Sequence, residues 1–263
     1  MNTKIFFWLM IGWLTPWSPL LAVEIKLGMT TSMDNAGITE LIKSHYEEHH
    51  PEHKLKIIVA GTGKILSYLD TQDLDLAIVH NKDRELAFLA DHPGHRLEVF
   101  SNAFILVGPK DDPAEVAQCP DLVVAMESIL TKGESFISRG DDSGTHIAER
   151  SLWLGTGNDF SKHKNYLETG AGSGQSLNTA AAMNAYMFVD SPTFYLHNNK
   201  RNLVPLKEHN QPNIYSLIVP TSNLSSEKLD ASMTFQRWLT SATAAKVFNQ
   251  LDSSLIRYIA TVN

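Results

Sequence analysis

The sequence is poor in cysteine: Cys119 stands alone, which excludes an internal disulfide. Basic residues are also in deficit, because 22 Lys and Arg residues stand against 29 Asp and Glu residues and the formal net charge is −7. A chain with this balance lacks the extended basic surface that binds nucleic acids or anionic lipids. We therefore expect no nucleic-acid partner, and any attraction for an anion must come from a local arrangement of donors and charge.

A long hydrophobic run is missing as well, since no stretch reaches the ~18 consecutive apolar residues typical of a membrane-spanning helix. At the N-terminus, Lys4 precedes the apolar residues 5–14, and prolines then lead to Ala22. This order predicts a signal peptide over residues 1–22, with cleavage after Ala22. Export without a disulfide or a lipid-bearing N-terminal cysteine predicts a periplasmic location.

Repeats and low-complexity linkers are absent, and the chain instead alternates strands with helices. Strand-like apolar runs at 25–29, 55–60 and 74–79 enclose helical spacing over 38–50 and 65–69. This βαβαβ order predicts a parallel sheet with crossover helices. Further strands are expected at 104–107, 185–189, 203–205 and 214–219, with helices over 121–131, after 146, after 174 and at the C-terminal end.

We interpret this pattern as an α/β fold with two lobes. Lobe 1 would combine residues 23–100 and 208–263, and lobe 2 would be the insert 101–207. The chain would cross between them near 101–103 and 207–212, which would form a hinge. Open α/β sheets bind ligands at the carboxyl ends of their strands, so the ligand cleft is expected between the lobes.

Four polar loops rich in Gly, Ser and Thr stand where predicted strands lead into helices. They are residues 30–32, 61–63, 138–145 and 170–176. Each can present hydroxyls and backbone N–H groups at the positive end of a helix, and Arg139 adds a full charge. Such a set suits a small dianion. The alternatives are that each loop only caps its helix, and that Arg139 only pairs with Asp141 or Asp142; one Asp could also hold the guanidinium while its other face meets the ligand.

Patterns that would indicate catalysis are incomplete. His45, Glu48 and His49 fit H-x-x-E-H, but the segment ends at Pro51, where histidines at a helix C-terminus are favoured by the dipole. His45 also continues the apolar face of its helix and is interpreted as a partly buried structural residue. Ser143 and His146 are three residues apart at a helix start, a spacing that does not place a base on a nucleophile. We expect no catalytic residue, no resident metal and no cofactor.

Several segments together resemble a known family. Thr30-Thr31-Ser32, Gly61-Thr62-Gly63, the nine residues 138–146 (SRGDDSGTH) and Tyr166 to Gly170 are similar, in order, to periplasmic tungstate-binding proteins of ABC transporters, the TupA-like family. The resemblance runs through almost the whole mature chain, and the nine-residue segment is its most specific part. It implies a type II two-lobed periplasmic binding protein that captures tungstate and hands it to a membrane permease.

The resemblance also implies a set of ligand-binding residues. On the lobe 1 side they are Thr30, Thr31, Ser32 and Thr62, and Gly63 of the same turn completes that side. On the lobe 2 side they are Ser138, Arg139, Ser143, Gly144 and Thr145. The sequence departs from the family at Met29, at Lys64 and at Ser191-Pro192, and Lys64 is expected to add a second positive charge near the site. We expect a monomer.

The identity of the anion depends on its protons. Tungstate and molybdate are fully deprotonated at neutral pH and need donors only, whereas phosphate carries a proton that needs an acceptor. Asp141 and Asp142 keep phosphate as the alternative ligand if one of them faces the ion. From other classes, a secreted hydrolase using His146 or the H-x-x-E-H segment and a receptor that signals through a membrane partner stay open.

Overall fold

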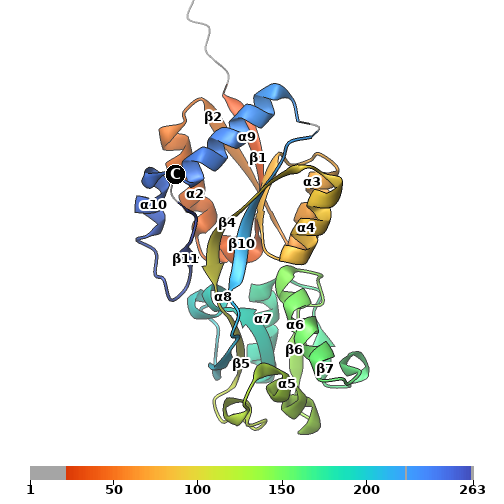
Figure 1. Cartoon of the computed structure of the whole chain (residues 1–263). Coiled ribbons are helices and arrows are strands. Elements are labelled where there is room, and N and C mark those ends of the chain that lie inside the picture. The colour runs from red at the N-terminus through yellow and green to blue at the C-terminus, as the bar shows by residue number, and fades with distance from the viewer. Residues whose placement is uncertain (1–21, 223, 262–263) are drawn as a thin grey trace, which may run out of the picture.

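The computed structural model describes residues 22–222 and 224–261, so the predicted signal peptide lies outside the described residues except for Ala22. Two β-sheets, each covered by helices, are stacked along the long axis of the molecule (Figure 1). Within the described ranges, no helix combines the length and apolar character needed to cross a bilayer. We call the part around the first sheet lobe 1 and the part around the second sheet lobe 2.

Lobe 1 contains a six-stranded sheet of order β11-β4-β10-β3-β1-β2. Its strands are β1 (Val23–Thr30), β2 (His53–Ala60), β3 (Leu76–Val79), β4 (Gly94–Asn102), β10 (Asn213–Pro220) and β11 (Arg257–Tyr258). Its helices are α1 (Thr31–Asn35), α2 (Ile38–His49), α3 (Thr62–Asp70), α4 (Lys82–Asp91), α9 (Ser226–Leu239) and α10 (Ala242–Phe248). The predicted parallel βαβαβ unit is confirmed, because β1 pairs in parallel with both β2 and β3.

Lobe 2 contains a five-stranded sheet of order β7-β6-β8-β5-β9. Its strands are β5 (Phe104–Pro109), β6 (Phe136–Ser138), β7 (Tyr166–Glu168), β8 (Tyr186–Asp190) and β9 (Leu203–Glu208). Its helices are α5 (Leu122–Thr131), α6 (Gly144–Gly155), α7 (Ser173–Met183) and α8 (Ser191–Leu196), with short 3₁₀ turns η1 (Val116–Gln118) and η2 (Phe160–Lys162). Strand β6 is parallel to β7 and β8, so polar loops again follow parallel strands.

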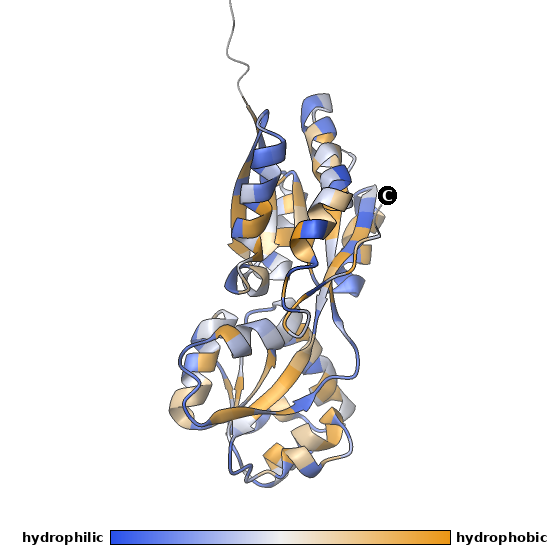
Figure 2. Ribbon diagram, turned by 90° about the vertical axis from the view of Figure 1, so that its left-hand side faces the viewer, coloured by the Kyte–Doolittle hydropathy of each residue, from blue (hydrophilic) through white to orange (hydrophobic). Residues whose placement is uncertain are grey.

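Each lobe has its own apolar core, visible as hydrophobic strands inside more polar helices (Figure 2). In lobe 1, Tyr46 of α2 packs edge-on against Phe235 and Trp238 of α9 at ring distances of 5.0 and 5.2 Å. In lobe 2, Trp153 of α6 packs edge-on against Phe136 of β6 at 5.0 Å. These buried aromatic contacts hold the helices on the sheets and so position the loops that begin them.

Several elements differ from the sequence prediction. Residues 30–35, expected as a loop, contain the short helix α1, and α4, β4 and α8 were not expected. The first sheet is also mixed, because β10 runs antiparallel to both β3 and β4. Strand β4 has an exposed, charged face instead of a continuous apolar run, which removes the usual strand signal.

The chain passes between the two sheets at Ala103 and at residues 209–212. These positions lie within the two crossing segments predicted from sequence, while the exact lobe boundaries stay a prediction. The carboxyl ends of β1, β2 and β3 and those of β6 and β8 all lead into helices at the junction of the lobes (Figure 1). This is the arrangement in which α/β sheets bind ligands.

Candidate functional site

Side chains from both lobes meet where the strands end. The hydroxyl of Ser32 in α1 donates to Oδ2 of Asp190 across the junction at 2.9 Å. A Cβ built on Gly61 would lie 3.4 Å from Cβ of Ser143, so the loop before α3 faces the loop before α6. The guanidinium of Arg139 reaches Ser173 at the start of α7. Because Thr30 also pairs with Ala60, next to Gly61, the four predicted polar loops lie at one junction between the lobes.

Arg139 lies at the centre of this junction and is 1% exposed. One terminal nitrogen donates to Oγ of Ser173 at 2.6 Å, and the other donates to Oδ2 of Asp141 at 2.5 Å. Its Nε atom has no hydrogen-bond partner among the residues that the structure describes. A buried N–H without a partner is costly, so this group is a candidate donor to a ligand.

The two acids of the loop are both engaged by hydrogen bonds within the protein. Asp141 accepts from Arg139 through one oxygen and from the backbone N–H of Ser143 through the other, at 3.2 Å. Asp142 is mostly exposed and receives both a 2.7 Å and a 2.8 Å hydrogen bond from Arg84 of lobe 1. Arg139 therefore pairs with Asp141, as two of the alternatives weighed for it expected, and the role of its remaining N–H group toward a ligand stays a prediction.

The predicted hydroxyl donors divide into two groups. Thr30 and Thr145 are buried, and within the described part of the chain their Oγ1 atoms have no partner. Ser32 and Thr62 differ from the expectation, because Ser32 donates to Asp190 and Thr62 donates to the carbonyl of His80 at 3.0 Å. The hydroxyls of these two residues are therefore already used by the protein, which leaves their backbone N–H groups as candidate donors.

Helix N-termini supply further donors. The first N–H groups of a helix have no intrahelical partner. Thr31 begins α1, Thr62 and Gly63 begin α3, and Gly144 and Thr145 begin α6. Ser143 caps α6 by accepting from the backbone N–H of His146 at 3.3 Å, which leaves its own proton available. The positive ends of α3 and α6 thus point into the same junction.

His80, which sequence reasoning left without a role, forms part of the lobe 1 wall. Its Nδ1 lies 2.8 Å from Oδ1 of Asn213, whose amide nitrogen donates to Asn102 and Tyr215. This network assigns the proton of the neutral ring to Nδ1, because Asn213 presents its oxygen there. Burial, together with the charge of nearby Arg139, lowers the pKa of His80 to about 4, although the hydrogen bond to Asn213 opposes the shift, so the imidazole is neutral at physiological pH.

The backbone of His80 also sets how closely the lobes approach. A Cβ built on Gly144 would lie 2.3 Å from the carbonyl oxygen of His80. Only glycine, which has no Cβ, allows the start of α6 to approach the end of β3 this closely. Gly144 therefore has a steric role that its place in the predicted donor loop did not reveal.

Sequence reasoning missed Asp190 at the start of α8. Its carboxylate is fully buried and accepts from Ser32, from the backbone N–H of Thr193 at 3.0 Å and from the hydroxyl of Thr193 at 2.9 Å. The sequence carried a signal for it, because an Asp followed by Ser191-Pro192 is typical of a helix N-terminus. Asp190 therefore links the lobes without leaving a carboxylate oxygen unengaged.

The residues considered for catalysis do not form catalytic pairs. His146 Nδ1 accepts from the backbone N–H of Asp142 at 3.1 Å, so its ring is directed to the loop backbone and not to Ser143 Oγ. Burial lowers the pKa of His146, which keeps the ring neutral at neutral pH. In the H-x-x-E-H segment, His49 bonds the carbonyl of His45, and Glu48 is exposed. These contacts are those of a helix end.

A different group of histidines lies on lobe 1, outside the H-x-x-E-H pattern. His50, Glu52 and His53 place one ligand atom each within 4.8 Å of one another, which is the one such group in the described residues. His53 is held by the phenol of Tyr46 at 2.6 Å.

Lys64 lies outside the candidate site. It is exposed and its ammonium lies over the ring of Tyr68, 4.8 Å from the centroid, so the expected second charge is directed along α3.

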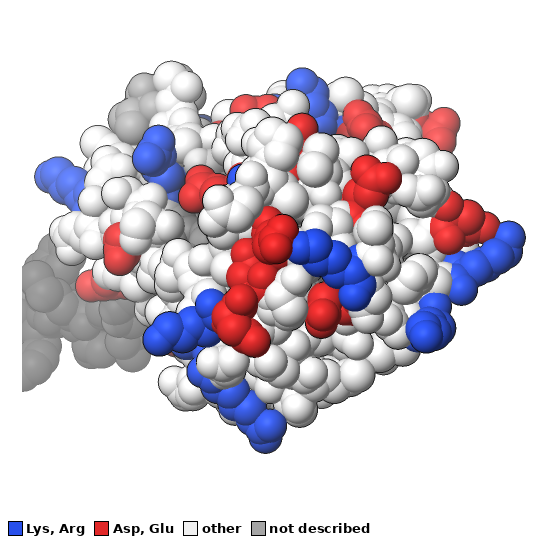
Figure 3. Space-filling model, turned by 90° about the horizontal axis from the view of Figure 1, so that it is seen from below, with Lys and Arg blue, Asp and Glu red and all other residues white. Residues whose placement is uncertain are grey.

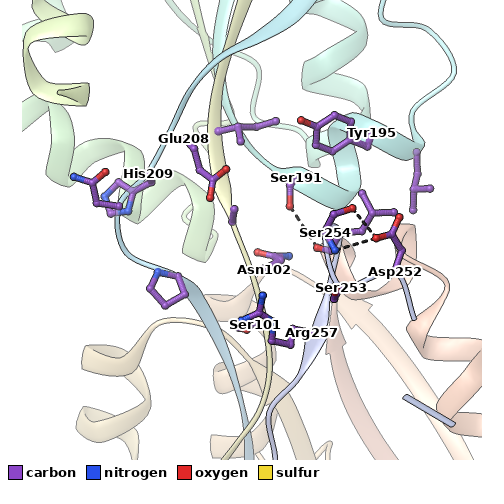
Figure 4. Close-up of a pocket in the computed structure, with 16 residues that line it drawn as sticks. Ser101, Asn102, Ser191, Tyr195, Glu208, His209, Asp252, Ser253, Ser254 and Arg257 are labelled. Carbon is purple, nitrogen blue, oxygen red and sulfur yellow. Dashed lines mark hydrogen bonds between the residues drawn. The ribbon is translucent and has the colours of Figure 1, made fainter. Parts of the chain in front are cut away.

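Two other regions of the described chain carry mixed charge. At the lobe 2 end, acidic and basic side chains are interspersed (Figure 3). A cavity of about 720 Å³ lies beside the crossing segments, where Glu208 and His209 of one segment face Asp252 and Arg257 near the C-terminus (Figure 4). Its lining includes carboxylates and lacks the residues of the predicted loops.

Comparison with known proteins agrees with this geometry. The family model of the PBP superfamily domain matches residues 21–243. The chain is 32% identical over 238 residues to the tungstate-binding protein TupA of Peptoclostridium acidaminophilum. The matched region covers 86% of this chain and 81% of that relative. Two solved structures are similar over most of their length. The tungstate ABC transporter structure from Geobacter sulfurreducens has 32% identity and a TM-score of 0.77, covering 87% of this chain and 98% of that one. The tungstate-binding protein TupA from Desulfovibrio alaskensis G20 has 29% identity and a TM-score of 0.74, covering 92% and 99%.

Proposed function

The chain belongs to the TupA-like family of tungstate-binding proteins within the PBP superfamily, and we propose that it captures tungstate outside the cytoplasm and delivers it to an ABC transporter. The family is one of transport proteins and not of enzymes, and the protein works as a solute-binding protein without catalysis. Its extracytoplasmic location follows from the same family. Removal of residues 1–22 as a signal peptide, a periplasmic location, docking on an inner-membrane permease and a monomeric state belong to the proposal.

One observation carries the choice of ligand: donors are left over at the lobe junction, while the carboxylates around it are engaged. Arg139 Nε, Thr30 Oγ1 and Thr145 Oγ1 are buried and lack partners among the described residues. Asp141 and Asp190 each accept protein hydrogen bonds on both oxygens. A site of donors suits a fully deprotonated oxyanion, which supports tungstate, with molybdate as the second candidate ion, over phosphate.

Binding by closure of the lobes is the proposed mechanism. The ion would contact the donors of one lobe, and the donors of the other lobe would then favour the closed arrangement. Support comes from three direct contacts between the lobes: Ser32 with Asp190, Arg84 with Asp142, and Gly144 with His80. Closure of this arrangement around the ion would exclude water and so strengthen each charge-assisted hydrogen bond to the ion.

The proposed ligand set follows from these positions. Arg139, Thr30, Thr145 and Ser143 would donate through their side chains, and Ser173 of the fourth loop joins them. Thr31, Ser32, Thr62, Gly63 and Gly144 would donate through backbone N–H groups. Ser138 would donate its hydroxyl proton to the ion as long as the neighbouring Glu149 is protonated. No resident metal or cofactor is part of the proposal, because these donors meet an anion directly.

Tungstate is expected to stabilise the protein strongly. A ligand present at ~100 times its dissociation constant adds ~2.7 kcal/mol to the free energy of unfolding, which corresponds to a rise of roughly 5–10 °C in the melting temperature for a chain of this size. Calorimetric titration with tungstate, molybdate, phosphate and sulfate measures the preference directly. Absence of heat with all of the first three would exclude the proposed function, and a stronger response to phosphate would replace tungstate as the ligand.

A further inference from the structure

A carboxyl group is buried in the wall of the candidate site, behind the loop that carries Arg139. Glu149 lies on α6 and is 1% exposed. Its Oε2 atom lies 3.0 Å from Oγ of Ser138, one of the proposed ligand-binding residues. The carboxyl therefore contacts directly a hydroxyl that the site would present to the ion.

Two further donors determine which oxygen of Glu149 can carry a proton. Oε1 accepts from the indole N–H of Trp153 at 3.2 Å and from the phenol O–H of Tyr166 at 3.0 Å. The two lone pairs of that oxygen are thus used, whereas Oε2 faces Ser138. A proton on Glu149 would lie on Oε2 and would be directed at Oγ of Ser138.

The charges around Glu149 favour the protonated form. Burial raises the pKa of Glu149 to about 8, and the carboxylate of Glu168 on β7 contributes to the increase, although the three hydrogen bonds lower it. On α6 itself, the exposed Arg150 follows it and His146, with a pKa lowered by burial, precedes it. Arg139, in the loop after β6, is engaged by Asp141.

The other elements that contact α6 add no counter-ion at this position. The apolar cluster that includes Trp153 also contains Met126 and Ile129 of α5 and Phe188 of β8. The titratable groups on those two elements are the exposed Glu127, Tyr186, whose phenol bonds Asp112 at 2.9 Å, and the buried Asp190 at the end of β8, which accepts from Ser32 and Thr193. A buried carboxyl in such surroundings keeps its proton more readily than one in water.

The protonation of Glu149 decides what Ser138 can offer to an ion. If Glu149 is protonated, Oε2–H donates to Ser138 Oγ, and the Ser138 hydroxyl proton is free to donate to the ion. If Glu149 is ionised, Ser138 must donate to Oε2 and would present its lone pairs to the ion. Loss of this one proton thus converts Ser138 from a donor into an acceptor. The negative charge of ionised Glu149 then also repels the oxyanion.

We propose that Glu149 is a positioning residue that holds a proton in the ion-bound protein and thereby turns the Ser138 hydroxyl toward the oxyanion. This inference rests on the proposed function and deepens it by linking capture of the ion to a protonated carboxyl. Ser138, Trp153, Tyr166 and Glu149 all belong to lobe 2, so the arrangement does not depend on contacts with lobe 1. The linkage makes binding weaker in alkaline solution.

Titration of tungstate calorimetrically from about pH 7 to about pH 9.5 tests the inference, because the ion is deprotonated throughout and any change belongs to the protein. For the wild type, we expect the dissociation constant to rise by up to about tenfold for each pH unit above the pKa of Glu149. Glu149→Gln places an amide N–H on Ser138 and an oxygen on Trp153 and Tyr166. It should bind as tightly as the wild type near neutral pH and should keep that affinity in alkaline solution.

Two further variants separate positioning from a general structural role. Glu168→Gln removes the exposed neighbouring carboxylate, which contributes to raising the pKa of Glu149, and should keep the pH dependence with its midpoint moved to lower pH. Ser138→Ala should bind more weakly at neutral pH and show a shallower pH dependence than the wild type, because only the repulsion by ionised Glu149 remains. Titrations in buffers of different ionisation enthalpy should report uptake of up to about one proton per ion above the pKa for the wild type, and none for Glu149→Gln.

The outcomes distinguish this inference from the proposed function. Normal affinity near neutral pH with the same pH profile in the wild type and Glu149→Gln would overturn the role of Glu149 alone. Weak binding by Glu149→Gln at neutral pH, with its fold and melting behaviour intact, would also overturn it. Absence of binding to tungstate, molybdate and phosphate in the wild type would overturn the proposed function, and this inference with it.

Discussion

Replacing Arg139 with alanine is expected to weaken tungstate binding by about 100-fold or more. The guanidinium is 1% exposed, and its Nε has no partner within the described residues. A charge-assisted hydrogen bond contributes ~1.5–3 kcal/mol, and ~2.7 kcal/mol corresponds to a factor of 100 in affinity. The alanine variant also leaves Asp141 without the cation that neutralises it, so a carboxylate would repel the incoming dianion.

Two matched variants show whether geometry or net charge matters at this position. Lys64→Ala removes one positive charge from an exposed side chain that lies over Tyr68, and it should change affinity by less than about threefold. Arg139→Lys keeps the charge but loses the planar fork that contacts Ser173 and Asp141 together, so intermediate binding is expected. Calorimetry with tungstate measures all three. Equal and small effects of Arg139→Ala and Lys64→Ala would place the site elsewhere.

The second large effect is expected from a single methyl group at Gly144. Its Cβ would lie 2.3 Å from the carbonyl oxygen and 2.5 Å from the ring Cε1 of His80. The carbonyl belongs to the backbone at the end of β3 and cannot rotate away as a flexible side chain could. Gly144→Ala should therefore oppose the closed arrangement and lower the affinity for tungstate by about tenfold to 100-fold, as expected for ~1–3 kcal/mol of overpacking.

The same substitution should leave the ligand-free protein as stable as the wild type. Gly144 begins α6, where alanine is the better helix former. Gly172→Ala is the control, because that residue also precedes a helix of lobe 2 and its Cβ would meet nothing within 4 Å. Calorimetry gives the affinities, and small-angle scattering with tungstate present reports closure. Wild-type affinity and compaction for Gly144→Ala would contradict a steric role of His80.

The predicted strands and helices were recovered where the apolar pattern was strong. Ile25, Leu27 and Met29 lie in the buried β1, and residues 185–189 correspond closely to β8. Elements with weak patterns were missed, such as β4 with its exposed charged face and the short helix α8. Periodicity reports burial on one face over several residues, so a partly exposed strand such as β4 and a helix of only 6 residues such as α8 carry little signal.

The candidate site was predicted in composition but not in detail. The loops at Gly61 and Arg139 were singled out because hydroxyls, glycines and a charge stand before helices, and these loops meet in the structure, where a Cβ on Gly61 would lie 3.4 Å from Cβ of Ser143. Which of their hydroxyl groups are left to donate to a ligand depends on partners far along the chain. Ser32 pairs with Asp190, 158 residues away, and Thr62 pairs with the backbone of His80. Such pairings arise from tertiary packing and have no local sequence pattern.

The sequence by itself determined the class of this protein: an α/β chain with scarce basic charge, a single cysteine and anion-type loops at helix starts, in an order that resembles one family of binding proteins. These properties follow from composition, local periodicity and motif order, which are encoded within short stretches. The tertiary structure alone decided which acids are neutralised by Arg139 and Arg84, that Gly144 meets His80, and that Glu149 lies behind Ser138. Those facts depend on distances between side chains from different elements, and a charge or hydrogen bond acts only through such distances.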